Sequence, residues 1–167
     1  HQQILKDAIK VFEFFHTNYR VYRYKHLIVS PHYTRNRFYK LIDREILNAS
    51  IGKPAYIKLK MNSLSDTKMI DKLYDASRAG VKIQLIIRGI CCLIPGVKDM
   101  SENIEAISIV DNYLEHSRVY IFGNNNDPEV FISSADFMPR NLDARVEITC
   151  PIYDLGIKKE LIDTFDL

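Results

Sequence analysis

Apolar residues recur along the chain at the spacing of an α-helix in four segments. In each segment they stand three or four residues apart, which brings their side chains to one face of a helix. The predicted core-facing residues of these helices are, in chain order, Ile4, Leu5, Ala8, Ile9, Phe12 and Phe15; Phe38, Leu41, Ile42 and Ile46; Met69, Ile70, Leu73, Tyr74 and Ser77; and Ile157, Leu161, Ile162 and Phe165. Ser65 and Asp154 are predicted to cap the third and fourth helices at their N-termini, and Gly80 is predicted to close the third.

Seven shorter segments have the composition of β-strands, since they are rich in β-branched and aromatic residues and are bounded by turn-forming residues. They are HLIVS, AYIKLK, VKIQLIIRG, IEAISIV, RVYIF, EVFIS and RVEITC, at residues 26–30, 55–60, 81–89, 104–110, 118–122, 129–133 and 145–150. The second and third enclose a helix with short joints, which predicts a right-handed parallel crossover. The turn sequence NNNDP between the fifth and sixth predicts an antiparallel hairpin. The pattern therefore predicts an α/β domain with a mixed central β-sheet flanked by helices.

The composition favours a single domain and limits what it binds. With 167 residues, of which 47% are hydrophobic, the chain is long enough for one domain, residues 1–167, and short for two. There are 23 Lys and Arg residues against 21 Asp and Glu, and a net charge of +2 gives no overall field for non-specific binding to nucleic acid or membranes. A site for a polyanion must therefore be a local cluster of cations.

The cysteines and the N-terminal sequence indicate in which cellular compartment the protein is expected. The chain has three cysteines, two of them adjacent as Cys91 and Cys92, and they fit neither a disulfide framework nor a zinc motif, which indicates a reducing compartment. No apolar run approaches the ~20 residues of a membrane span and no leader opens the chain, so we expect a cytoplasmic protein without a transmembrane segment. Because the chain begins at His1 and enters a helical pattern at once, we also expect a domain excised from a longer protein.

A basic set of side chains stands at or near the predicted strand ends and loops. It comprises Lys60, Arg88, His116, Arg118, Arg140 and Arg145, with Asn62, Ser134 and Asn141 as neutral donors. Guanidinium groups match phosphate oxygens in bidentate fashion, and a chain of phosphoryl groups needs several such contacts in line. The set therefore indicates a phosphate site, in which Lys60 and Arg88 share one edge of the sheet. The alternative is structural ion pairing of these cations with Asp136, Asp143 and Glu147, and it is equally well supported for Arg145 with Glu147.

One motif in this cluster is similar to a known superfamily. His116 and Arg118, the strand that follows them, and the segment 134–136 resemble the C-terminal half-motif of the phospholipase D superfamily, whose fold carries His-x-Lys-x4-Asp. Arg118 stands in place of that Lys and Gly123 in place of that Asp. The counterpart in the first half, residues 58–60, has Lys where the partner His would stand. The diesterase motif is therefore broken.

A closer resemblance is to the last domain of the long, histidine-phosphorylating polyphosphate kinases. It rests on several motifs in the same order: KPAYIKLKMNSL, MIDKLYDASRAGVKI, RGICCL, PGV, SENI, LEHSRV and SADFMPRNLD. Together they cover nearly the whole chain, from Tyr24 to Ile152. The resemblance implies a phospholipase D-like fold and, for the intact protein, reversible transfer of the terminal phosphate of ATP to polyphosphate.

The same resemblance implies roles for individual residues. In that family ATP phosphorylates a histidine in the domain that precedes this one, and the phosphoryl group then passes to the end of a polyphosphate chain. Arg88 and His116 match residues that contact the nucleotide or its phosphates, and His116 is expected to be catalytic, as an electrostatic or acid/base helper. The expected ATP- and phosphate-binding set is completed by Lys60, Asn62, Arg118, Arg140 and Asn141. The Mg²⁺ ligands are expected in the preceding domain, with no metal ligand here.

The resemblance also implies partners, and two other functions stay open. We expect ATP, ADP and inorganic polyphosphate as ligands, contacts with the preceding domains of the same chain, a homo-oligomer when intact, and no nucleic acid. The isolated domain is expected to lack kinase activity because it lacks the phosphorylated histidine. The alternatives are a degenerate phospholipase D-like phosphodiesterase or nuclease, and a non-catalytic polyanion-binding module. One observation argues against the phosphodiesterase or nuclease. That chemistry requires two histidines, each beside a Lys, and His116 alone qualifies as one of them.

Overall fold

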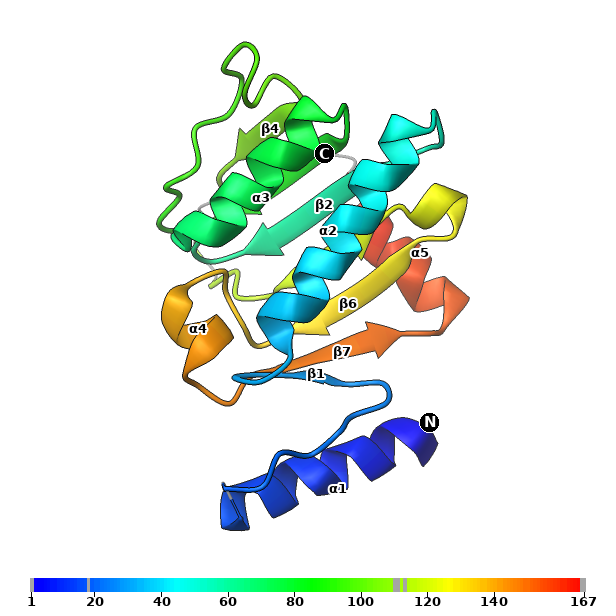
Figure 1. The fold of residues 1–167 in the computed structure, drawn as a ribbon, viewed down its shortest axis with the longest axis vertical. Helices are drawn as coiled ribbons and strands as arrows, with labels where there is room; N and C mark the ends of the chain where they lie inside the picture. Colours follow the sequence, from blue (N-terminus) through cyan, green and yellow to red (C-terminus); the bar gives the residue numbers. More distant parts are fainter. Residues whose placement is uncertain (1, 18, 110–111, 113, 166–167) are drawn as a thin grey trace.

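A computed structural model describes residues 2–17, 19–109, 112 and 114–165 of the chain. Its centre is a seven-stranded β-sheet with the strand order β1-β7-β6-β5-β2-β3-β4 (Figure 1). The strands are β1 (Ile28–Val29), β2 (Tyr56–Met61), β3 (Lys82–Ile87), β4 (Ile104–Ile107), β5 (Val119–Phe122), β6 (Glu129–Ser133) and β7 (Ile148–Ile152). The described helices are α1 (Gln2–His16), α2 (Thr34–Ser50), α3 (Thr67–Arg78), the 3₁₀ helix η1 (Asn124–Asn126), α4 (Pro139–Asp143) and α5 (Leu155–Asp163).

The sheet is mixed, as the sequence predicts. Strands β2, β3 and β4 are parallel neighbours, and the pairs β2–β5, β5–β6, β6–β7 and β7–β1 are antiparallel. This confirms the parallel crossover through α3 and the hairpin of β5 and β6. Because of these directions, β2, β3 and β6 all end at the same edge of the sheet, at Met61, Ile87 and Ser133. We call this edge the carboxyl edge.

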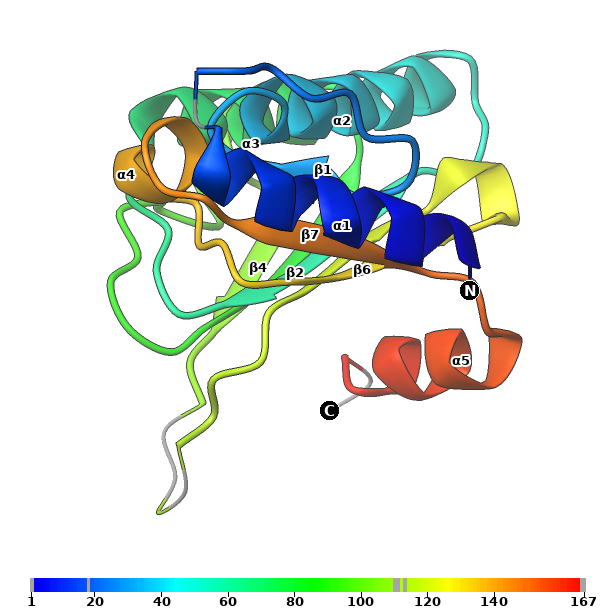
Figure 2. The same cartoon turned by 90° about the horizontal axis from the view of Figure 1, so that it is seen from below.

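Helices cover both faces of the sheet. Helices α2 and α3 lie over one face, and α5 lies under the other (Figure 2). The main core lies between the sheet and α2 with α3, and its largest fully buried side chains include Phe38, Leu41, Leu59, Met69, Leu73, Tyr120, Phe122 and Phe137. A smaller cluster on the opposite face contains Ile86, Val119, Ile121, Val130 and Phe165, with Leu161 and Ile162 packed against it.

The predicted faces of α2 and α3 are confirmed, but one predicted cap is wrong. The residue that caps α3 is Asp66, whose carboxylate accepts a hydrogen bond from the Met69 amide at 2.9 Å. Ser65 instead donates its backbone N–H to the carbonyl of Phe137 at 3.0 Å, which places it in the preceding loop. Gly80 follows α3 with φ +91°, a conformation that favours glycine and confirms the predicted helix end.

The predicted buried face of α1 is right for Ile4 and Ala8, which pack against a buried cluster, and wrong for the other four residues. The residues expected to face the core but found exposed are Leu5, Ile9, Phe12 and Phe15. Val11 and Phe14 are buried instead, together with Asp7. The Asp7 carboxylate accepts hydrogen bonds from the backbone N–H groups of residues 25–27 at 2.6–3.1 Å. These bonds turn the side of α1 that carries Asp7 toward the segment before β1. Apolar residues surround much of this helix, so a buried carboxylate decides which side packs.

Two features at the C-terminal end differ from the prediction. Strand β7 was predicted over residues 145–150, whereas the backbone amide of Arg145 bonds back to the Arg140 carbonyl at 2.8 Å and the strand begins at Ile148. Asp154 caps α5 as predicted by accepting the Ile157 amide at 3.0 Å, but the Ile157 side chain is exposed rather than buried. The reason is that α5 packs through its last turn. Residue 110 of the predicted fourth strand lies outside the described residues.

None of the described helices has the length and apolar character that crossing a membrane requires.

Candidate functional site

The loops that follow β2, β3 and β6 are tied together at the carboxyl edge. Leu64, in the loop after β2, forms isolated β-bridges with Cys91 after β3 and with Phe137 after β6. Its backbone N–H donates to the Ile90 carbonyl at 2.8 Å, and the Asp66 amide donates to the Phe137 carbonyl at 2.9 Å. Leu64 and Phe137 are fully buried. Polar side chains carried by these loops therefore start from a fixed backbone.

Gly89 brings two of these loops into close approach. Its backbone N–H donates to the Asn62 carbonyl oxygen at 2.7 Å. A β-carbon at this position would lie 3.0 Å from the same oxygen, which is closer than nearly all real contacts of that kind. The missing side chain therefore allows Arg88, the preceding residue, to stand beside Asn62.

Asp136 is the acceptor at the centre of the site. It is 7% exposed, and its Oδ1 accepts Nε of Arg118 at 2.9 Å while its Oδ2 receives Nη2 at 3.3 Å. The same Oδ1 accepts the backbone N–H of Asn62 at 2.9 Å. A bidentate arginine–carboxylate pair fixes the plane of the guanidinium group. Asp136 thus orients Arg118 and links the loop after β6 to the loop after β2.

Asn62 extends this network to Arg88. Its side chain is buried, with 5% exposure, and its Oδ1 accepts Nε of Arg88 at 2.9 Å. Among the described residues, the two terminal amino groups of Arg88 donate to no protein group. A guanidinium held through Nε keeps its terminal N–H groups in one plane and available to an anion.

His116 lies beside this network at the start of β5. Its Nε2 is 3.4 Å from Nη2 of Arg118, and its carbonyl accepts Nη1 of the same residue at 3.2 Å. The imidazole is exposed. One protonatable ring therefore stands next to an oriented guanidinium at the open side of the carboxyl edge.

Lys60 is held by two residues that the sequence analysis did not select. Its Nζ donates to Ser117 Oγ at 2.6 Å and pairs with Glu115 Oε1 at 2.7 Å. The hydrogen bonds from Lys60 and then Ser117 lower the pKa of Glu115 to about 2. Lys60 and Arg88 line the same small hollow, of about 10 Å³, which confirms that they share one edge of the sheet. The sequence feature that could have indicated Glu115 and Ser117 is their position on either side of His116.

Arg140 and Asn141 belong to a separate cluster in α4. Arg140 is exposed and donates to the sulfur of Met138 at 3.7 Å. Asn141 is buried, with 5% exposure, and its Nδ2 donates to Glu147 at 2.5 Å, while the other oxygen of Glu147 accepts Ser134 Oγ at 2.5 Å. None of the described contacts joins this pair to Asp136. Their assignment as phosphate ligands stays a prediction.

The ion-pair alternative holds for some of the cations. Asp136 pairs with Arg118 as that alternative required. The pair of Arg145 and Glu147 is wrong, because within the described ranges Glu147 instead receives the amide and hydroxyl donors of α4 and the loop after β6. Asp143 binds Arg35, whose guanidinium also forms two 2.7 Å hydrogen bonds to Asp66. These bonds, first to Asp66 and then to Asp143, raise the pKa of Arg35.

Gly123, where the diesterase motif is broken, lies in a crowded position. This residue is buried directly after β5, and a β-carbon there would lie 2.7 Å from the ring of Tyr56. An aspartate at this position, as in the phospholipase D pattern, would require the ring of Tyr56 to move. Nor does any group of three His, Cys, Asp or Glu side chains within the described ranges have the arrangement needed to hold a metal ion.

Comparison with known proteins identifies the family. The family model described as polyphosphate kinase C-terminal domain 2 matches residues 27–167. The polyphosphate kinase of Vibrio vulnificus (strain YJ016) is 50% identical over 166 residues, which are 99% of this chain and 24% of that protein. The chain thus spans about a quarter of the length of the curated relatives it matches.

Solved structures agree with this assignment. The crystal structure of the polyphosphate kinase from Porphyromonas gingivalis matches 99% of this chain and 26% of its own, with a TM-score of 0.93 and 44% sequence identity. Nuc from Salmonella typhimurium, a phospholipase D family member, matches 84% of this chain and 90% of its own with a TM-score of 0.61 and 15% identity, which shows a shared fold alone. The chain has a phospholipase D-like fold and belongs to the polyphosphate kinase family, in which it is the C-terminal domain 2.

Proposed function

We propose that this domain supplies part of the nucleotide and polyphosphate site of an ATP:polyphosphate phosphotransferase. The observation that carries the proposal is Arg88: its guanidinium is anchored through Nε to buried Asn62, and its terminal N–H groups are available for phosphate oxygens. In phosphoryl transfer the charge spreads over the oxygens of the transferred group, and catalysis depends mostly on positioning and on charge stabilisation. A fixed fork of N–H donors is suited to both.

His116 and Arg118 complete the arrangement. Arg118 is oriented by Asp136, and the imidazole of His116 lies 3.4 Å from it. In its protonated form His116 stabilises negative charge on the phosphoryl group, and in its neutral form it accepts a proton. Lys60 adds a third cation from β2, and its charge is shared with Glu115. Lys60 therefore contributes attraction to the site more than a defined contact.

Other parts of the function rest on family membership. The family supports ATP, ADP and polyphosphate as ligands. Mg²⁺ bound with the nucleotide neutralises phosphate charge, and we propose that its ligands lie in the preceding domain, as does the phosphorylated histidine. The 167-residue chain alone is accordingly expected to form no acid-labile phosphate with ATP and Mg²⁺. A homo-oligomeric intact protein, a cytoplasmic location and the absence of nucleic acid among its partners stay predictions.

The test uses the intact enzyme with Arg88→Lys and His116→Gln. Arg88→Lys keeps the charge but loses the fork, and hydrogen bonds to charged groups are worth about 1.5–3 kcal/mol, so turnover should fall about 10- to 150-fold. His116→Gln should lower turnover while the melting temperature stays unchanged. Arg78→Lys on the exposed side of α3 is the matched control. Wild-type turnover in either site variant removes that residue from the site.

The phosphodiesterase alternative has its own assay. Hydrolysis of bis-p-nitrophenyl phosphate by the chain, lost in His116→Gln, would contradict the proposed transferase role. The sequence argues against that result, because Gly123 stands where the diesterase pattern has its aspartate.

A further inference from the structure

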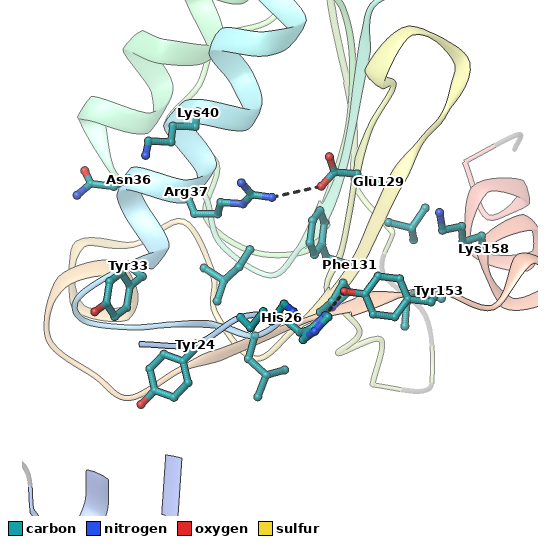
Figure 3. Close-up of a pocket in the computed structure, with 16 residues that line it drawn as sticks. Tyr24, His26, Tyr33, Asn36, Arg37, Lys40, Glu129, Phe131, Tyr153 and Lys158 are labelled. Atoms are coloured by element: carbon teal, nitrogen blue, oxygen red, sulfur yellow. Dashed lines mark hydrogen bonds and ion pairs between the residues drawn. The ribbon is translucent and has the colours of Figure 1, made fainter. Parts of the chain in front are cut away.

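A second pocket lies away from the carboxyl edge, on the face of the sheet that carries α2. It opens beside the first turns of α2, over the ends of β1, β6 and β7 (Figure 3). Its volume is about 420 Å³, which falls within the range of pockets that bind small molecules. None of its lining residues belongs to the phosphate site described above.

The floor of this pocket is apolar. On the α2 face it is formed by Ile28 and Phe131, each 5% exposed or less, whereas the side chains of Leu27 and Val130, which also line the pocket, pack in clusters on the other side of the sheet. Free energy is gained when a flat or apolar group of a ligand covers the aromatic ring and the branched side chain of this floor. A purely ionic ligand gains nothing from this floor.

The walls are joined by aromatic contacts between three parts of the chain. Tyr24 and Tyr33 meet edge to face with ring centroids 6.1 Å apart, which ties the segment before β1 to α2. On the other side, His26 Nδ1 and the hydroxyl of Tyr153 lie 2.6 Å apart, which ties the same segment to the residue after β7. Burial raises the pKa of both Tyr24 and Tyr153, so their hydroxyls stay protonated as donors. The pocket is therefore built before any ligand arrives.

Cations surround the rim. They are Lys25, Arg37, Lys40 and Lys158. The single carboxylate among the lining residues is Glu129, whose charge is matched by Arg37 at 3.5 Å and by an ion pair with Arg44 outside the pocket. Among the described residues, the side chains of Lys25 and Lys40 donate to no protein group, and the ammonium of Lys158 donates to a backbone carbonyl at 3.0 Å. The rim thus has surplus positive charge above an apolar floor.

From this combination we infer that the pocket is a second binding site for a phosphate ester of a flat ring, such as a nucleoside diphosphate. The ring covers Phe131 and Ile28, and the phosphates reach Lys25 and Lys40 at the rim. Inorganic phosphate chains can pair with the lysines of the rim, but they leave the apolar floor exposed to water. A nucleoside without phosphate covers the apolar floor, but it brings no phosphate to the lysines of the rim.

Calorimetric titration of the 167-residue chain tests this with three probes: ADP, adenosine and pyrophosphate. ADP is expected to bind at least about tenfold more tightly than either of the others, because it alone meets both the floor and the rim. The titrations are repeated in Arg88→Ala, which removes the anchor of the proposed phosphate site. Amide NMR shifts on addition of ADP should centre on Tyr33, Lys40 and Phe131 in that variant.

Charge reversal locates the binding. Lys40→Glu should weaken ADP at least about tenfold, and so should Lys25→Glu. Lys53→Glu, which changes the net charge equally at the residues after α2, should leave it unchanged. Melting curves confirm that each variant is folded. If one of the two rim variants fails to fold, the other still tests the site.

Three results would overturn the inference. One is the absence of ADP binding at millimolar concentration, and another is pyrophosphate binding as tightly as ADP. The third is ADP binding that Arg88→Ala abolishes and both rim variants retain. That last pattern assigns all nucleotide binding to the proposed phosphate site, so failure of one proposal is distinguishable from failure of the other.

Discussion

The cations at the carboxyl edge and those around the pocket are held in different ways. At the carboxyl edge, Arg118 and Arg88 are fixed through the buried acceptors Asp136 and Asn62. Around the pocket, Lys25 and Lys40 are exposed on the surface above an apolar floor. Arginine carries a planar fork that a carboxylate can orient, whereas lysine is a flexible point charge.

This difference separates orientation from attraction. A reaction that transfers a phosphoryl group needs donors in fixed positions, because a small displacement of the reacting atoms is costly. Binding alone needs only sufficient charge and contact area. The carboxyl edge has donors in fixed positions, whereas the pocket has charge and contact area. The two regions should therefore respond differently to substitution.

The largest expected effect comes from removing the central acceptor. Asp136→Ala leaves the Arg118 guanidinium and the Asn62 amide without their partner in a largely buried site. The free energy of unfolding in urea should fall by about 3 kcal/mol. Asp71→Ala, on the exposed side of α3, is the control and should change it by less than about 0.5 kcal/mol. Equal stability of the two variants would show that Asp136 does not hold the edge together.

A smaller effect is expected from filling the space at Gly89. In Gly89→Ala the new β-carbon meets the Asn62 carbonyl oxygen at 3.0 Å, so the two loops must move apart. The free energy of unfolding should fall by about 1–2 kcal/mol, as for other overpacked sites. Chemical denaturation measures this. An unchanged or higher stability would mean that the loops adjust freely and that Arg88 is not fixed by their contact.

Acid titration tests the ion pair of Lys60. The pKa of Glu115 is lowered to about 2, so the pair stabilises the fold above the ordinary pKa of 4.5, and this stabilisation is lost as the pH falls toward 2. Because Glu115 is 40% exposed, the contribution should be under about 1 kcal/mol. The difference in unfolding free energy between wild type and Glu115→Gln should shrink between pH 5 and pH 2. A difference independent of pH would exclude the ion pair as its cause.

The smallest effect is expected at the pocket rim. Lys40 is exposed and donates to no protein group within the described ranges, so Lys40→Ala should change the free energy of unfolding by less than about 0.5 kcal/mol. Differential scanning calorimetry provides the measurement. A loss comparable with that of Asp136→Ala would remove the contrast between the two regions.

Helices α3 and α1 show how far the sequence alone predicts this fold. In α3 the apolar residues are confined to one face, with polar residues elsewhere, so Met69 and Leu73 could be placed in the core. In α1 apolar side chains occur on most of the circumference, and the periodicity cannot tell which side packs. The decision is made by Asp7, whose backbone partners lie in a loop almost twenty residues away.

The sequence predicts that several polar side chains gather at one edge of the sheet, but it does not predict the hydrogen bonds among them. Strand ends followed by polar residues pointed to Lys60, Asn62 and Arg88, because the carboxyl ends of parallel strands share one edge. Ion pairing of Asp136 with one of the cations of the site was among the alternatives, but its hydrogen bond to Asn62 was not predictable, because it depends on the loop after β6 reaching the loop after β2. That contact is set by the bridges at Leu64, and no local pattern encodes it.

The pairing of β1 with β7 has a consequence for the order in which the chain folds. Ile28 and Val29 pair with Ile148 and Thr149, from opposite ends of the chain. During synthesis on the ribosome, α1 and β1 emerge long before β7, the strand that pairs with β1. Contacts so distant in sequence form late, because the entropy of closing the loop must be overcome first. The segment from α1 to β1, with its exposed apolar side chains, therefore lacks its partner strand until β7 has been synthesised.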